Sequence, residues 1–132
     1  DIVHCHGWLT SLVPLYLLKL YSDDPVFHKF KTVYSVYNNG FKKPLKSSLP
    51  DKLEADGIEK NAIKSIKNKT DFLHITKLAT DYSDGIIIGC DTIDEEVKKY
   101  LAGLNIPLLE YQGEENYIDA YNNFYDTLLQ EN

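Results

Sequence analysis

Short segments rich in β-branched and aromatic residues predict four strands, at residues 2–5, 32–37, 86–88 and 106–109. The third segment is an unbroken apolar run between two glycines, which is typical of a central parallel strand covered on both faces. The fourth contains Pro107, whose nitrogen cannot donate to a sheet, so we expect this strand near an edge.

The segments between and after these strands carry helical spacing of apolar residues. Helices are predicted at about residues 10–20, 51–56, 59–67, 71–82, 93–102 and 115–130. Thr10 or Ser11, Asp71 and Thr92 are the expected capping residues of three of them. In the first helix apolar residues cover almost the whole circumference, which predicts burial on most sides.

Strands and helices alternate along the chain, and this order implies βαβ crossovers and a parallel sheet with helices on both faces. We therefore expect an α/β fold, a three-layer αβα sandwich with a Rossmann-like sheet of about four strands. A chain of 132 residues is long enough for one compact domain and not for two, so residues 1–132 are expected to form a single domain.

The start of the chain indicates a piece of a longer protein. The sequence contains no methionine and opens directly on a predicted strand, whereas natural chain ends are usually loose. If earlier strands of the sheet are missing, residues 2–5 form an exposed apolar edge. Such an edge pairs readily with another strand, which predicts a homodimer formed through it.

The net charge, the cysteines and the apolar stretches of the sequence limit which partners and which cellular compartment are expected. The net charge of -6 argues against a nucleic-acid partner, because phosphates require a basic surface. Cys5 and Cys90 lie far apart and form no disulfide framework, which favours a reduced, cytoplasmic protein. The longest apolar stretch, residues 12–20, is too short to span a bilayer, so no membrane partner is expected.

Three blocks of the sequence resemble bacterial glycogen synthases and plant starch synthases. The first, DIVHCHGWLTSLVPLYL at residues 1–17, resembles the family pattern D-[VI]-[VI]-H-[AC]-H-D-W-H-[AT] and the P-x-Y-L that soon follows it. The second, VYSVYN at 33–38, is similar to V-F-T-[VI]-H-N. The third, at 72–86, is similar to F-L-K-x-[AG]-[IL]-x-[YF]-A-D-x-[VI]; the family's serine-proline-threonine motif then falls within residues 89–92. Short bacterial members of the family are similar over the full length of this chain.

The resemblance implies a retaining glucosyltransferase that moves glucose from ADP-glucose to an α-1,4-glucan. It also implies the two-domain GT-B fold, of which these residues would form the second half of the N-terminal domain. The partners are then a nucleotide-sugar donor and an α-glucan, and no bound cofactor is expected. The residues at matched positions that we expect to contact substrate are His6, Gly7, Trp8, Tyr37 and Asn38.

Three departures from the family pattern weaken the catalytic interpretation. Gly7 stands where the family has aspartate, Leu9 where it has histidine, and Tyr37 where it has the histidine of the H-N pair. Sugar transfer passes through an oxocarbenium-like state that needs polar groups around the ring. We therefore assign no catalytic residue and expect the chain alone to be inactive. The alternative is a non-catalytic module that binds glucan or protein.

Structural roles also account for two of the matched residues. Trp8 is equally compatible with a tryptophan of the core or of an interface. Asn38 is equally compatible with a turn, because Asn39-Gly40 follows it. An unrelated nucleotide-binding α/β domain is disfavoured, since no glycine-rich phosphate loop follows the first predicted strand.

Two histidines of the first predicted strand are candidate metal ligands. His4 and His6 alternate along the strand and therefore share one face. A third ligand is not evident, although His28, His74 or Cys90 could fold nearby. We expect no metal, because both histidines already match a family signature that binds none.

Overall fold

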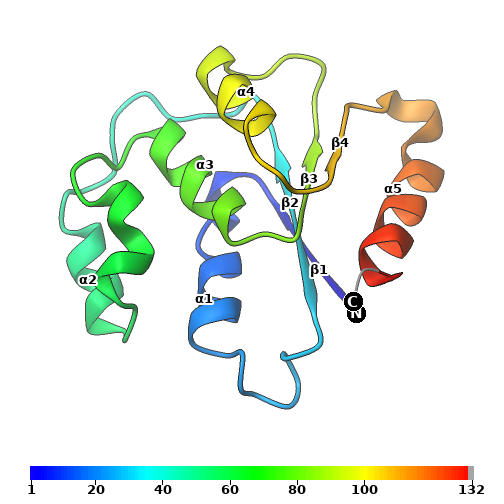
Figure 1. Cartoon of the computed structure of the whole chain (residues 1–132). Coiled ribbons are helices and arrows are strands. Elements are labelled where there is room, and N and C mark those ends of the chain that lie inside the picture. The colour runs from blue at the N-terminus through cyan, green and yellow to red at the C-terminus, as the bar shows by residue number, and fades with distance from the viewer. Residues whose placement is uncertain (131–132) are drawn as a thin grey trace.

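The computed structural model describes residues 1–130 and contains one sheet of four parallel strands in the order β1-β2-β3-β4 (Figure 1). The strands are β1 (Ile2–His6), β2 (Lys31–Val36), β3 (Gly85–Ile88) and β4 (Leu108–Leu109). The predicted Rossmann-like parallel sheet is confirmed, and β1 and β4 lie at its two edges. β4 is shorter than predicted: Pro107 accepts a hydrogen bond from Ile86 but has no N–H to return.

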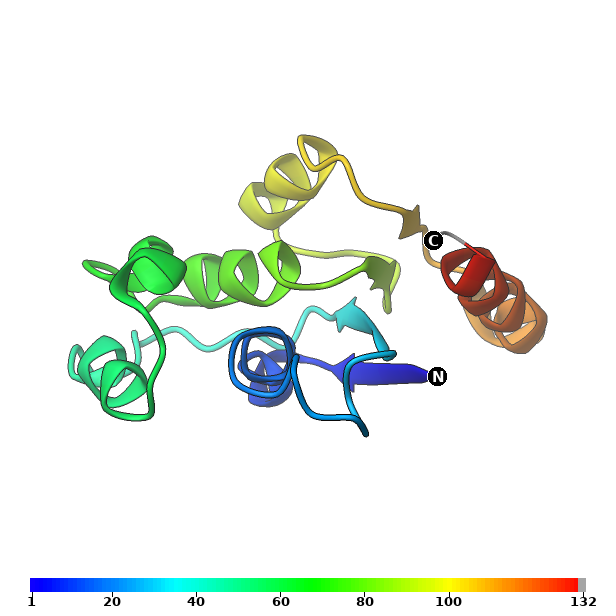
Figure 2. The same ribbon diagram turned by 60° about the horizontal axis from the view of Figure 1, so that its bottom comes forward.

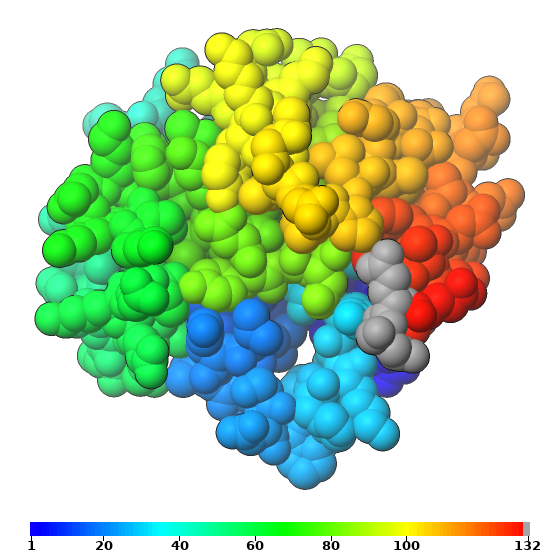
Figure 3. Space-filling view, in the orientation of Figure 1, coloured from blue at the N-terminus to red at the C-terminus, as the bar shows by residue number. Residues whose placement is uncertain are grey.

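Helices lie on both faces of this sheet. They are η1 (Trp8–Thr10), α1 (Val13–Lys19), α2 (Leu49–Ala55), η2 (Lys60–Ile66), α3 (Phe72–Asp81), α4 (Glu95–Ala102) and α5 (Gly113–Gln130), where η marks a 3-10 helix. α5 covers one face, and α1, α3 and α4 lie on the other, which gives the three predicted layers (Figure 2). In the space-filling view α5 (orange to red) forms one flank of the molecule and the segment around η2 (green) the other (Figure 3).

Alternating side chains of the strands build a separate core on each face of the sheet. The core under α5 contains Val33, Ile87, Phe124 and Leu128. The core under α3 and α4 contains Cys5, Tyr34, Val36, Ala79, Ile86, Ile88, Ile93, Val97 and Leu101. A third cluster joins the helices α1, α2, η2 and α3 to one another. Because β3 lies between two strands and two helical layers, all four of its residues are buried, as its apolar run predicted.

The capping predictions had mixed outcomes. The carboxylate of Asp71 accepts a hydrogen bond from the backbone N–H of His74 at 2.9 Å, so the predicted cap of α3 is confirmed. The predicted cap at Thr92 is wrong. Asp94 caps α4 instead, because its carboxylate accepts from the N–H groups of both Glu96 and Val97.

The prediction of one helix at 10–20, buried on most sides, is also wrong. The segment forms η1 and the seven-residue α1, and only Pro14 and Leu15 of α1 are buried. Val13 and Leu18 are 37% and 52% exposed. The physical reason is that α1 lies beside β1, the edge strand of the sheet. It packs against α3 on one side, and among residues 1–130 no helix covers its opposite side.

The parallel strands bring their following loops to one edge of the sheet. Two backbone hydrogen bonds extend the ladders into these loops, from the N–H of Gly7 to the carbonyl of Ser35 (3.0 Å) and from Gly89 to Val36 (2.8 Å). Residues far apart in the sequence therefore meet beyond the carboxyl ends of β1, β2 and β3. Among residues 1–130, none of the helices has the length and apolar character needed to cross a bilayer.

Candidate functional site

The residues singled out from the sequence follow β1 and β2 at the carboxyl edge of the sheet. β1 ends at His6 and leads into Gly7 and Trp8, while β2 leads into Tyr37 and Asn38. Open α/β sheets bind ligands beyond the carboxyl ends of their strands. The fold thus brings the matched positions of two sequence blocks, about 30 residues apart, to the edge where this kind of fold binds ligands.

His6 and Tyr37 form a direct pair. The Nδ1 atom of His6 lies 2.7 Å from the hydroxyl oxygen of Tyr37. The ring of His6 stacks on that of His4, with 3.9 Å between centroids, so the predicted common face is confirmed. His4 is held in turn by Ser35, whose hydroxyl lies 2.6 Å from Nε2, and by the hydroxyl of Tyr125 at Nδ1.

Burial favours the neutral form of both histidines. Burial, and then the charge of neighbouring His6, lowers the pKa of His4 from 6.5 to about 4. Burial also lowers the pKa of His6. A neutral imidazole has one donor and one acceptor nitrogen, so His6 and Tyr37 together offer hydrogen-bonding groups without charge. Such groups suit the hydroxyls of a sugar.

Gly7 acts as a turn residue in this arrangement. Its φ of 75° lies in the left-handed region that residues other than glycine avoid. Its N–H is bonded to Ser35, and its carbonyl accepts from both the N–H and the hydroxyl of Thr10. The side-chain amide nitrogen of Asn39 lies 3.4 Å from the point where a Cβ would stand. The positive φ explains why a glycine stands at position 7, and the backbone of Gly7 is occupied by internal contacts.

Gly89 is a site residue that the sequence analysis missed. A Cβ at this position would stand only 2.4–2.8 Å from atoms of the Tyr37 ring, so the ring lies directly on the glycine. The one available signal was that Gly89 begins the segment where the family's serine-proline-threonine motif falls. The large ring at position 37 therefore requires a residue without a side chain at position 89.

Cys90 links the loops that follow β2 and β3. Its sulfur accepts a hydrogen bond from the backbone N–H of Asn38 at 3.2 Å, and its thiol donates to the carbonyl of Thr92 at 3.1 Å. Asn38 itself is exposed. This contact fixes the backbone at Asn38 beside the His6–Tyr37 pair.

Trp8 contacts the helical layer. Its ring packs edge-on against Phe41, with 4.7 Å between centroids, and Phe41 packs against Phe72. Trp8 also lines a hollow of about 170 Å³ whose wall is mainly aliphatic. These contacts agree with the interpretation of Trp8 as a residue of the core or of an interface.

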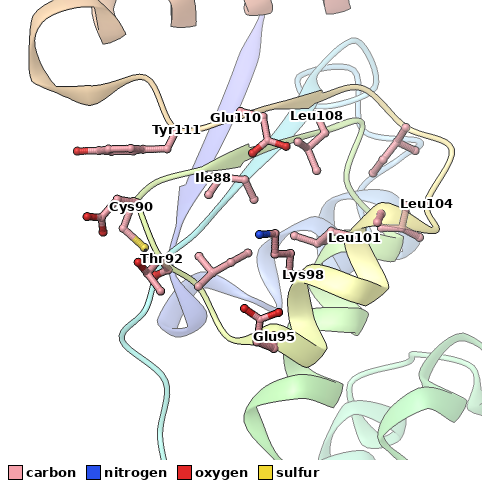
Figure 4. Close-up of a pocket in the computed structure, with 14 residues that line it drawn as sticks. Ile88, Cys90, Thr92, Glu95, Lys98, Leu101, Leu104, Leu108, Glu110 and Tyr111 are labelled. Carbon is pink, nitrogen blue, oxygen red and sulfur yellow. Dashed lines mark hydrogen bonds between the residues drawn. The ribbon is translucent and has the colours of Figure 1, made fainter.

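Two hollows open near the ends of β3 and β4. The larger, of about 500 Å³, lies between the loops after β3 and β4 and the helix α4 (Figure 4). The smaller, of about 280 Å³, lies where Gly89 faces the start of α5. Tyr111 lines both. The residues of either hollow carry no role predicted from the sequence, although tyrosines repeat along the last predicted helix.

Metal binding finds no support in the positions of the candidate ligands. Among residues 1–130, no three histidine, cysteine or acidic side chains come together as a metal-binding group. The nitrogens of His4 are engaged by Ser35 and Tyr125, and Nδ1 of His6 by Tyr37.

The sheet, its crossovers and its polar carboxyl edge define a Rossmann-like α/β domain of the kind found in glycosyltransferases. The chain belongs to the starch synthase catalytic domain family, whose model matches residues 1–108. It is 51% identical to the glycogen synthase of Pseudothermotoga lettingae over 41 residues, 31% of this chain and 8% of that protein. It is 39% identical to the glycogen synthase of Fervidobacterium nodosum over 66 residues, 45% of this chain and 14% of that protein. No solved structure matches the chain.

Proposed function

We propose that the chain is part of a glycogen synthase-type glucosyltransferase with the GT-B fold, which transfers glucose from ADP-glucose to an α-1,4-glucan. The match of the starch synthase catalytic domain to residues 1–108 carries this proposal. The matched chain spans only 8–14% of the glycogen synthases it resembles. We therefore propose that the 132 residues contribute sugar contacts but do not catalyse transfer alone.

His6 and Tyr37 are the side chains that we propose to contact the sugar. They are uncharged, hydrogen-bonded to each other and placed at the carboxyl edge of the sheet. Asn38 lies beside them and is exposed, so its amide is available to a hydroxyl group. Gly7 contributes through the turn that it forms, and Trp8 through its position at the start of η1.

A specific observation favours a second candidate, a non-catalytic module that binds glucan or protein. Leu9, where relatives carry histidine, is 82% exposed and has no polar group to offer a reacting sugar. Gly7 and Tyr37 also differ from the aspartate and histidine of the family pattern that the sequence resembles, and neither supplies a carboxylate or a base active near pH 7. Binding would survive such replacements more readily than catalysis.

Two measurements test the proposal. The first follows radiolabelled glucose from ADP-glucose into glycogen, and we expect background incorporation from this chain. The second follows the histidine ring signals by NMR during titration with ADP-glucose and with maltoheptaose. We expect both ligands to shift the His6 signal and Tyr37→Phe to weaken the effect, with Tyr21→Phe as the control.

The results separate the two candidates. A His6 shift with both ligands supports the glucosyltransferase proposal. A shift with maltoheptaose and none with ADP-glucose favours the non-catalytic module. No shift with either ligand contradicts the glucosyltransferase proposal and a glucan-binding module, and leaves a protein-binding module as the candidate. Transfer by the chain itself contradicts the proposed inactivity. Leu9→His restores a residue of the family pattern and can be assayed for glucose transfer in the same way. Gly7→Asp is less suitable, because aspartate at position 7 would be strained at a φ of 75°.

We further propose a cytoplasmic location, no nucleic-acid partner and a homodimer through β1. In residues 1–130, β1 is an edge strand, and Ile2 and Val3 on it are only half-buried. An open apolar edge of this kind favours pairing with a second copy.

A further inference from the structure

The lysines of the chain are concentrated in the segment that contains α2 and η2. Residues 42–69, here called the basic lobe, hold eight of the fourteen lysines and four acidic residues. The lobe therefore has a net charge of +4 in a chain whose net charge is -6. All eight lysines are exposed. None of the three sequence blocks that resemble the glycogen synthase family includes this segment.

Three of these lysines line one hollow of the basic lobe. Lys60, Lys64 and Lys67 lie around a hollow of about 670 Å³ between α2 and η2. Asp51 and Glu54 line it too, yet within residues 1–130 no lysine of the lobe lies within 4 Å of a carboxylate oxygen. Cations without such partners leave a positive potential that attracts an acidic surface.

The opposite charge is concentrated on α5 and on the loop before it. Residues 103–130 contain five acidic residues and no lysine. Glu115, Asp119 and Asp126 follow one another at intervals of four and seven residues, so they share one side of α5, here called the acidic face. All three are exposed, whereas Phe124 and Leu128 on the other side of α5 pack against the sheet.

The two charged surfaces are too far apart to meet within one molecule. In Figure 3 α5 forms one flank and the basic lobe around η2 forms the other. A second copy of the chain can bring its acidic face to the lysines of the first. Complementary charges of this kind steer association and fix its orientation. Ile118 on α5, which is 61% exposed, adds an apolar side chain that such a contact would cover.

We infer that the basic lobe is a docking surface for α5 of a second copy of this chain. The three lysines of the hollow lie against the acidic face of the second copy. Because the two surfaces differ, the contact is head to tail and leaves one free surface of each kind, so longer assemblies form as the concentration rises. The contact uses neither β1 nor the residues proposed to bind sugar, and it does not depend on the proposed function.

Sedimentation velocity at about 0.1 M and about 1 M salt tests this contact, because the screening length falls from about 10 Å to about 3 Å between these conditions. We expect the parent chain to form larger species at the lower salt concentration and to lose them at the higher. Pairing through the backbone of β1 should persist at both. The salt-sensitive species therefore report on the head-to-tail contact alone.

Two triple variants reverse the charge of one surface each. The first carries Lys60→Glu, Lys64→Glu and Lys67→Glu, and the second carries Glu115→Lys, Asp119→Lys and Asp126→Lys. All six side chains are exposed, so the fold should be kept, which circular dichroism checks. Each variant alone should lose the salt-sensitive species. An equimolar mixture of the two should regain them, because the intact lysines of the second variant meet the intact acidic face of the first.

A control of equal net charge separates the contact from general repulsion. Lys29→Glu, Lys98→Glu and Lys99→Glu change the net charge as much as the first triple variant, but these lysines lie outside the basic lobe. This control should keep the salt-sensitive species. Their loss in the control would assign the association to net charge and refute the docking surface.

Three further outcomes would overturn the inference. A parent chain without salt-sensitive association refutes it, and so does a triple variant that associates as the parent chain does. Failure of the mixed variants to associate shows that the two surfaces are not partners. If the parent chain binds polyglutamate but not a second copy, the lysines serve an acidic partner other than α5, and the inference is again wrong.

Discussion

Tyr37 and Gly89 fit each other so closely that a change in one constrains the other. The space for the ring of Tyr37 is the space that a side chain at position 89 would fill. The hydroxyl of Tyr37 then reaches Nδ1 of His6. Tyr37 thus supplies a polar partner for His6.

Gly89→Ala should lower the free energy of unfolding by about 1–3 kcal/mol, because the new methyl group overlaps the Tyr37 ring. The backbone of Gly89 has no positive φ, so the cost is steric alone. Gly103→Ala is the control, since its Cβ would meet the nearest atom at an ordinary 3.5 Å. In a chain that already carries Tyr37→Ala, Gly89→Ala should lower the free energy of unfolding much less, as measured by urea denaturation. A loss that persists in the double variant would show that the ring is not its cause.

His4 should make the chain less stable in mild acid. Its pKa is 6.5 when unfolded and about 4 in the folded chain, so the unfolded state binds more protons between these values. The free energy of unfolding therefore falls as pH drops through this window, and the contribution of His4 is complete above pH 6.5. Because His4 is only partly buried, we expect a loss of about 1–2 kcal/mol.

Urea denaturation at pH 7 and pH 4.5 measures this effect. The loss on acidification should shrink in His4→Asn and stay unchanged in His28→Gln, whose ring is exposed. An unchanged loss in His4→Asn would assign the pH dependence to other groups.

Helices and strands of this chain could be predicted where local chemistry decides the outcome. The apolar run of β3 and the carboxylate of Asp71 specify a buried strand and a helix start without help from the rest of the chain. Burial of α1 was mispredicted, because an apolar circumference does not reveal how many neighbours a helix has. The contact between Tyr37 and Gly89 joins residues 52 apart, a pairing set by the register of β2 and β3 rather than by spacing.

The residue that caps α4 is another feature that the local sequence did not determine, and this assignment can be tested. Thr92 and Asp94 are both good capping residues, and the structure uses Asp94. Asp94→Ala should lower the free energy of unfolding by about 1 kcal/mol, because two N–H groups of α4 lose their acceptor. Thr92→Ala should leave it nearly unchanged in the same urea denaturation. Equal losses in the two variants would contradict the assignment of the cap.

At the scale of the whole molecule, the sheet has two unequal edges. β4 is two residues long, and Pro107 before it gives no N–H, so this edge offers little to another strand. β1 is five residues long and contains no proline. Light scattering should therefore find dimers, and Val3→Lys on the open edge should yield monomers. A monodisperse monomer in the parent chain would contradict pairing through β1.

The position of the single tryptophan has a practical consequence. Trp8 is packed against Phe41 in the helical layer, whereas Tyr117, Tyr121 and Tyr125 lie on α5. Fluorescence excited at the red edge of absorption comes from Trp8 alone and reports on the loop after β1. Tyrosine emission comes from the ten tyrosine rings, and three of these lie on α5. The molecule thus carries two optical reporters, one on the loop after β1 and one weighted toward α5.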